Sequence, residues 1–201
     1  MNHDQPFRVA LIVIFLVVFP IGIYYRVKSQ TTGEKLDRRQ EGLFILATLR
    51  PMGAAFWLGL IVWMVNPSSM AWSGVSLPIW LRWTGVGLIT IASGLLVWTF
   101  QSLGGNLTDT VVTRQSHSLV LHGPYRWIRH PLYAAAALFM LAISLIAANW
   151  FFVVTGVLVV SLLVIRTRTE ERNLVSRFGM SYRTYMEQTG RFLPRIGTNR
   201  R

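Results

Sequence analysis

Residues 132–165 read LYAAAALFMLAISLIAANWFFVVTGVLVVSLLVI, and no charged side chain interrupts them. Asn149 divides this stretch into two apolar runs, residues 132–148 and 150–165. A helix rises about 1.5 Å per residue, and the hydrocarbon core of a bilayer is about 30 Å thick. Each run is therefore close to the shortest helix that can cross a membrane. The stretch therefore predicts a tight hairpin of two membrane-spanning helices.

Three further apolar runs precede the hairpin, and each is long enough to cross a bilayer. They cover residues 7–25, 43–65 and 77–100. Hydrophobic residues make up 52% of the 201-residue chain and charged residues only 14%, against about a quarter charged in soluble domains. We expect one all-α domain over residues 1–201, an integral, multi-pass membrane bundle of about five transmembrane helices with a C-terminal cytoplasmic amphipathic segment.

The basic residues are distributed unevenly along the chain, whose net charge is +12. Seventeen of the twenty Lys and Arg residues fall in three segments, residues 26–41, 101–131 and 166–201. Five spans place these segments on one side, and the positive-inside rule assigns that side to the cytoplasm. We therefore expect the N-terminus outside and the C-terminus in the cytoplasm. Because the basic residues flank apolar runs, we expect membrane lipids and not nucleic acid as their partners.

Residues 117–133 read HSLVLHGPYRWIRHPLY and bring three His, two Arg and two Tyr together just before a membrane helix. Pro131 suits the first turn of that helix, where its missing N–H costs nothing. His130 then falls near the N-cap, where backbone N–H groups can receive a carboxylate. A basic interfacial loop with aromatic anchors is an equally acceptable interpretation of the composition.

A second polar cluster follows the last apolar run and consists of Arg166, Glu170 and Glu171. Arg166 and Glu170 are four residues apart, so they share one face of a helix. Two adjacent carboxylates where a helix leaves the membrane are costly unless a cation meets them. The simpler interpretation is an ion pair within the helix, with Glu171 in water. Both clusters belong to the same predicted membrane face, so they could close one binding site.

Arg50 is unusual because it lies inside the second apolar run, about 10 Å beyond the start of that run by helix rise. Its side chain either reaches back to the cytoplasmic interface or faces the bundle and helps to bind an acidic acceptor. The chain has no cysteine, which excludes thiolate nucleophiles and cysteine metal sites, and we expect no metal site.

Two motifs carry a resemblance to a known family. They are His-Ser-Leu-Val-x-x-Gly-Pro-Tyr-x-x-x-Arg-His-Pro-x-Tyr before the hairpin and Arg-x-x-x-Glu-Glu-x-x-Leu-x-x-x-Phe-Gly-x-x-Tyr-x-x-Tyr after it. Their order and spacing resemble the isoprenylcysteine carboxyl methyltransferase family over about residues 117–194, whereas the first hundred residues resemble it only as generic spans. The resemblance implies an enzyme that uses S-adenosylmethionine as methyl donor.

The resemblance also implies roles for individual residues. Residues 101–131 and 166–201 would be the cytoplasmic cofactor-binding segments. The residues expected to bind the cofactor are His117, Ser118, Leu119, Val120, Tyr125, His130, Pro131, Leu132, Tyr133 and Glu170. Arg166 takes the position that contacts the methyl acceptor, so it is the expected catalytic and substrate-binding residue, with Arg50 as a second substrate-binding candidate.

The expected acceptor is a lipophilic small molecule or a lipid-anchored substrate, such as an isoprenylcysteine carboxylate. A carboxylate is already ionised and needs no general base, whereas an amine or thiol would have to lose a proton. Membrane sterol reductases, which use NADPH, also carry an Arg-His-Pro-x-Tyr element and are the alternative. The Glu170-Glu171 pair and the His-Ser-Leu-Val start favour the methyltransferase. A transporter or scaffold is less compatible, because no internal repeat is present.

Overall fold

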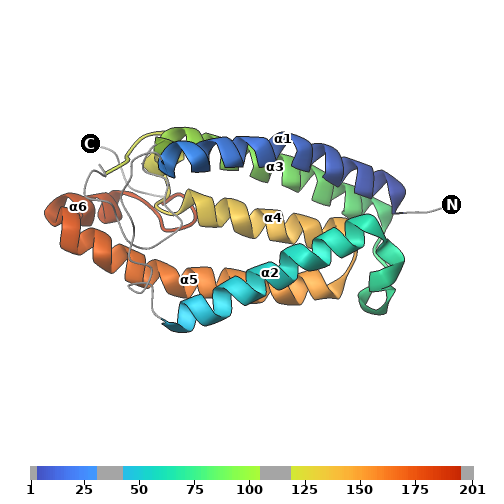
Figure 1. Cartoon of the computed structure of the whole chain (residues 1–201). Coiled ribbons are helices and arrows are strands. Elements are labelled where there is room, and N and C mark those ends of the chain that lie inside the picture. The colour runs from blue at the N-terminus through green and yellow to red at the C-terminus, as the bar shows by residue number, and fades with distance from the viewer. Residues whose placement is uncertain (1–3, 31–42, 105–118, 196–201) are drawn as a thin grey trace.

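The computed structural model describes residues 4–30, 43–104 and 119–195, with the side chains of residues 29, 30 and 43–46 left aside. Helices account for nearly all of the described chain, and no strand occurs in it (Figure 1). The helices are α1 (Gln5–Gln30), α2 (Leu43–Val65), η2 (Pro67–Ser73), α3 (Ile79–Leu103), η4 (Gly123–Arg126), α4 (Pro131–Ala147), α5 (Trp150–Phe178) and α6 (Met180–Gln188). The predicted all-α fold is therefore confirmed.

Four of the described helices, α1, α2, α3 and α5, are long and apolar enough to cross a membrane. The fifth apolar helix, α4, has 17 residues, which corresponds to about 25 Å of helix. Four candidate spans and one shorter apolar helix agree with the predicted bundle of about five, and the chain is an integral membrane protein.

Helix α5 continues well past the apolar run that ends at Ile165, and it ends only at Phe178. No proline or glycine interrupts residues 157–178, and the helix ends at Gly179, whose φ of 56° lies in the left-handed region. The charged residues after Ile165 are therefore held on the same rigid helix as the span.

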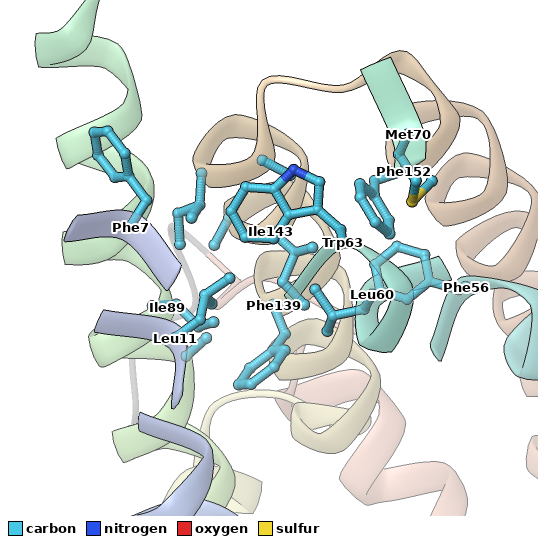
Figure 2. Close-up of a cluster of buried hydrophobic side chains, with 14 residues drawn as sticks. Phe7, Leu11, Phe56, Leu60, Trp63, Met70, Ile89, Phe139, Ile143 and Phe152 are labelled. Atoms are coloured by element: carbon cyan, nitrogen blue, oxygen red, sulfur yellow. The ribbon is translucent and has the colours of Figure 1, made fainter. Parts of the chain in front are cut away.

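The core lies where α4 packs between α3 and α5, with α1 against α3 and α2 against α5. Gly85 allows the close approach of α3 to α4, because a Cβ at this position would lie 2.9 Å from Ile146 Cγ1 and 3.0 Å from Ala142 O. The largest side chains of the buried cluster are labelled in Figure 2 and include Phe7, Leu11, Phe56, Leu60, Trp63, Ile89, Phe139, Ile143 and Phe152. Exposed apolar side chains on α1 and α2, such as Leu16 and Leu58, suit contact with lipid.

The turn between α4 and α5 is closed by polar side chains. Asn149 accepts a hydrogen bond from Phe151 N at 2.9 Å and donates one to Met70 O at 3.1 Å. Arg82 is buried, donates to Ile146 O at 2.9 Å and pairs with Asp4 at 2.7 Å. These bonds satisfy the end of α4 and the start of α5, where a helix leaves backbone groups without partners.

The two ends of the bundle are formed by different elements. The start of α1, η2 and the α4–α5 turn lie at one end, and the start of α4, the polar part of α5 and α6 lie at the other (Figure 1). The described parts of segments 101–131 and 166–201 therefore share one end, which we call the polar end. Its assignment to the cytoplasm rests on the distribution of basic residues.

Candidate functional site

The chain enters α4 through a short structured turn. Helix η4 begins at Gly123, whose φ is 62° and where a Cβ would collide with the Ser102 hydroxyl of α3. Only glycine fits there, so the turn is seated directly on α3. His130 then occupies the N-cap position of α4 and Pro131 its first turn, as predicted from the sequence. The first turn of α4 thus directs its backbone N–H groups toward the polar end.

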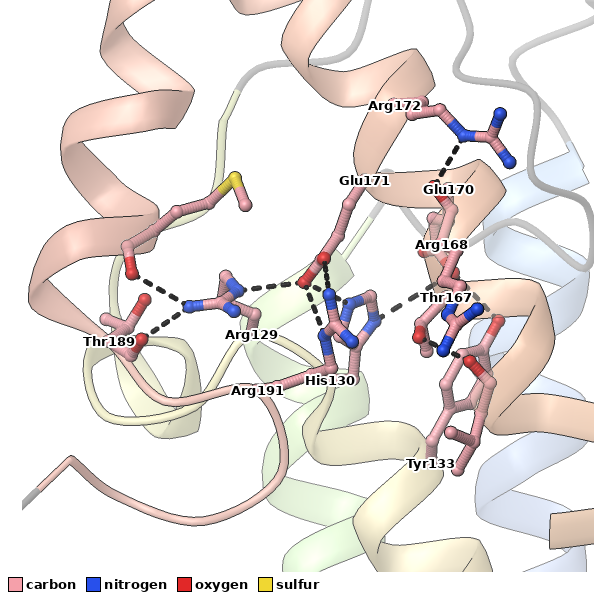
Figure 3. A network of polar contacts seen from close by, with 12 residues as sticks. Arg129, His130, Tyr133, Thr167, Arg168, Glu170, Glu171, Arg172, Thr189 and Arg191 are labelled. Carbon is pink, nitrogen blue, oxygen red and sulfur yellow. Dashed lines mark hydrogen bonds and ion pairs between the residues drawn. The ribbon is translucent and has the colours of Figure 1, made fainter. Parts of the chain in front are cut away.

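The two polar clusters identified in the sequence contact each other (Figure 3). Tyr133 of α4 donates a hydrogen bond to Glu170 Oε2 of α5 at 2.9 Å. The His130 ring is buried, with Nε2 3.3 Å from Glu171 Oε1 and Nδ1 3.9 Å from Glu170 Oε2. Residues about 40 positions apart in the sequence therefore form one site.

Glu171 lies at the centre of this site and not in water, so the simpler interpretation of its position is wrong. Its side chain is only 6% exposed. It accepts a hydrogen bond from Arg129 Nε at 2.9 Å and from Arg191 Nε at 3.2 Å, and it forms an ion pair with Arg191. A buried carboxylate is costly without such partners, and His130 with the two arginines supplies them.

The two arginines were not among the predicted site residues. Arg129 directly precedes His130 in the first motif, and this position could have marked it as a site residue. Arg191 gives no such signal, because it lies 20 residues beyond Glu171 in an irregular segment. The structure alone brings it to the site.

Residues 189–195, which we call the C-terminal strap, run beside the turn that leads into α4. Arg129 N donates to Gly190 O at 2.9 Å, His130 N donates to Arg191 O at 3.0 Å, and Gly190 N donates to Trp127 O at 3.1 Å. The Phe192 ring lies 5.8 Å from the His130 ring, which stacks on Tyr133 at 5.5 Å and an interplanar angle of 4°. The His130 ring is therefore enclosed by aromatic rings and by the carboxylates.

Three tyrosines support the same region from α6 and η4. The Tyr185 hydroxyl donates to Tyr125 O at 2.7 Å. Burial raises the pKa of Tyr182 and of Tyr185 above the ordinary value. Burial, and secondarily the charge of Glu170, also raises the pKa of Tyr125. All three phenols therefore stay neutral near physiological pH.

The remaining predicted residues are distributed around this site. Leu119, Val120 and Leu132 are half-buried, and Arg166 is half-buried on α5, four residues before Glu170. His117 and Ser118 lie outside the described residues.

Arg50 is exposed on α2. Helix α2 packs against α5, where Phe56 and Phe152 have ring centroids 5.4 Å apart. Arg50 is seven residues before Trp57 and so shares its helix face. Trp57 packs edge-on against Phe15 of α1 at 5.7 Å. This face of α2 is therefore turned toward α1.

The sequence model of the isoprenylcysteine carboxyl methyltransferase family matches residues 85–176. A methanethiol S-methyltransferase of Pseudomonas deceptionensis is 27% identical over 168 residues, which cover 80% of this chain and 61% of that protein. A protein-S-isoprenylcysteine O-methyltransferase of Tribolium castaneum is 30% identical over 121 residues, 58% of this chain and 43% of that protein. This chain thus spans 43–61% of the length of these relatives.

The fold is similar to a solved structure of a eukaryotic intramembrane Ras methyltransferase, an isoprenylcysteine carboxyl methyltransferase. The TM-score is 0.52 at 20% identity, and the match covers 93% of this chain and 68% of that one. The family match, the fold and the two named relatives agree, and they confirm the resemblance that the two sequence motifs carry.

Proposed function

We propose that this chain, a membrane protein of the isoprenylcysteine carboxyl methyltransferase type, transfers a methyl group from S-adenosylmethionine to a lipophilic acceptor at the cytoplasmic face of the membrane. The observation that carries the proposal is the contact between the start of α4 and the polar part of α5, through Tyr133, His130 and Glu170. The alternative, an NADPH-dependent reductase, receives no support from the relatives, two of which are named methyltransferases.

The residues at the polar end fit this methyl donor. S-adenosylmethionine carries a carboxylate and an ammonium group a few bonds from its sulfonium. The N–H groups of the first turn of α4 suit the carboxylate, and the half-buried Glu170 suits the ammonium group or a ribose hydroxyl. The Tyr133 hydroxyl holds Glu170 in place at 2.9 Å. Tyr125, Leu119 and Val120 add half-buried surface on the same turn.

When bound, S-adenosylmethionine supplies an activated methyl group, so the protein's task is alignment and exclusion of water. Arg166 lies four residues before Glu170 on α5, so the two side chains share one helix face. A guanidinium at this position orients an anionic acceptor beside the donor site. Arg50 on α2 is a second candidate for the same task. No general base is required for an acceptor that is already ionised.

The acceptor class follows from the surroundings of the site. Five apolar helices meet the polar end, and their outer faces carry exposed apolar side chains. A lipophilic acceptor can therefore reach the site from the bilayer, with its anionic group at the depth of Arg166. A carboxylate on a prenylated cysteine satisfies both requirements. A small thiol, which the name of the Pseudomonas relative suggests, lacks the apolar group and would have to lose a proton.

The proposal is tested by methyl transfer from labelled S-adenosylmethionine in lipid nanodiscs. The acceptors are a prenylated cysteine with a free carboxylate and, separately, methanethiol. We expect label in the prenylated cysteine as a base-labile ester. We expect Arg166→Ala to remove most of the turnover, and Arg183→Ala to retain it as an exposed control of equal charge loss. Stabilisation of the protein by NADPH and not by S-adenosylhomocysteine would refute the proposal.

A further inference from the structure

We propose that Arg191 is a positioning residue, which closes the C-terminal strap over His130 and thereby fixes the donor-binding carboxylate of Glu170. This inference rests on the proposed function, because it assigns Glu170 to the methyl donor. The side chain of Arg191 does not reach Glu170 in the structure, and its partner is the adjacent Glu171 (Figure 3).

Two sets of contacts hold Gly190 and Arg191 of the strap, one to the turn before α4 and one to α5. The first is the set of backbone hydrogen bonds that joins Gly190 and Arg191 to residues 127–130. The second is the pair between Arg191 and the buried Glu171 on α5. The backbone bonds join the strap only to the turn. The side-chain pair joins the strap to α5, which carries the carboxylates.

The two arginines that bind Glu171 differ in their other contacts. Arg129 is 10% exposed and also donates to the backbone carbonyls of Met186 and Thr189, so it fixes the end of α6 as well as Glu171. The Arg191 side chain is 37% exposed, and among the described residues it bonds only to Glu171. Loss of Arg191 leaves Glu171 with Arg129 and His130, so the buried charge keeps partners and the fold is retained. Removal of Arg191 therefore loosens the strap, while Arg129 still holds Glu171 and the end of α6.

The effect reaches Glu170 through His130. The ring of His130 lies between the two carboxylates, 3.3 Å from Glu171 and 3.9 Å from Glu170. It also stacks on Tyr133, whose hydroxyl holds Glu170. On its other side lies Phe192, the residue after Arg191. When Arg191 releases Glu171, the strap keeps only its backbone bonds, so Phe192 packs less firmly on the His130 ring. The His130 ring, and with it the stacked Tyr133 that holds Glu170, is then less fixed in position.

The test is calorimetric binding of S-adenosylhomocysteine to the purified full-length protein in nanodiscs. The variants are Arg191→Ala, Arg191→Lys and the exposed control Arg183→Ala. We expect Arg191→Ala to weaken affinity about tenfold, which is at the lower end of typical coupling between sites. The fraction of protein that binds should stay unchanged. Arg191→Lys, which keeps the charge but loses the two-pronged contact, should recover part of the affinity.

A purely structural role would lower the fraction of protein that binds and leave the affinity of the remainder unchanged, and this result would overturn the proposal. Equal affinities of Arg191→Ala and Arg183→Ala would overturn it as well. If the wild-type protein itself does not bind S-adenosylhomocysteine, the proposed function fails, and the role of Arg191 fails with it. If the wild type binds and only the difference between the variants is missing, the proposed function stands and the role of Arg191 is refuted.

Discussion

Replacing Glu171 by glutamine is expected to lower the free energy of unfolding substantially, although the two side chains have nearly the same shape. The carboxylate is 6% exposed and faces two guanidinium groups and the His130 ring. The amide keeps one acceptor oxygen, but its NH₂ group then points at a donor, and the negative charge is lost. Arg129, at 10% exposure, is left as a buried cation without a counter-charge.

The magnitude follows from these contacts. Breaking a buried pair by removing one partner costs about 3–5 kcal/mol, and each hydrogen bond to a charged group contributes about 1.5–3 kcal/mol. Two features place this case lower. The Arg191 side chain is 37% exposed and can turn to water, and glutamine still accepts one hydrogen bond. We therefore expect a loss of about 2–3 kcal/mol for Glu171→Gln.

Glu170→Gln is the matched control, one position earlier on the same helix. The Glu170 side chain is 27% exposed and accepts from the neutral Tyr133 hydroxyl, which glutamine can also satisfy. Its expected cost is below about 1 kcal/mol. Both variants are measured without cofactor by denaturant titration in detergent, followed by the fluorescence of the eight tryptophans. Equal stabilities of the two variants would refute the argument that Glu171, and not Glu170, is the buried glutamate with a full set of cationic partners.

Two further predictions concern the helix contacts and the tyrosines. Gly85→Ala should destabilise the protein by about 1–3 kcal/mol, because a Cβ there would lie 2.9 Å from Ile146 Cγ1. Gly87→Ala is the control, since a Cβ there meets no atom within 4 Å, and it should stabilise the protein by about 0.5–1 kcal/mol. The same titration measures both, and equal effects would contradict the packing of α3 on α4. Since burial raises the pKa of Tyr182 and Tyr185, the unfolded chain loses these protons first, so stability should fall as pH rises above about 10. Ultraviolet titration checks this, and simultaneous ionisation of all tyrosines would contradict it.

The helices could largely be predicted because hydropathy and helix-terminating residues give independent signals. The second apolar run, 43–65, has the bounds of α2, and Pro131 starts α4 as expected. The spacing of Arg166 and Glu170 predicted one helix for both, but the sequence did not predict that this helix continues to Phe178, because hydropathy reports where lipid ends and not where a helix ends. The backbone continues through Arg166 to Phe178, since no helix-breaking residue occurs before Gly179.

The site could be predicted only in part. The motifs indicated that the turn before α4 and the charged residues of α5 could close one site, and Tyr133 and Glu170 do meet. The partners of Glu171 could not be deduced, because Arg191 reaches it through an irregular strap with no periodicity. Irregular backbone is positioned by hydrogen bonds such as that from His130 N to Arg191 O, and such bonds leave no pattern in the sequence.

The adjacent glutamates show how one dipeptide can serve two purposes. Successive residues on a helix point about 100° apart, so Glu171 faces the interior, where Arg129 and Arg191 neutralise it. Glu170 faces the half-open side and accepts from Tyr133, a neutral donor. Arg129 and Arg191 are thus bound to Glu171, whereas the observed partners of Glu170 are the Tyr133 hydroxyl and the His130 ring. This division of partners is what the proposed donor site requires, because the ammonium group of S-adenosylmethionine would meet a carboxylate that neither Arg129 nor Arg191 pairs with.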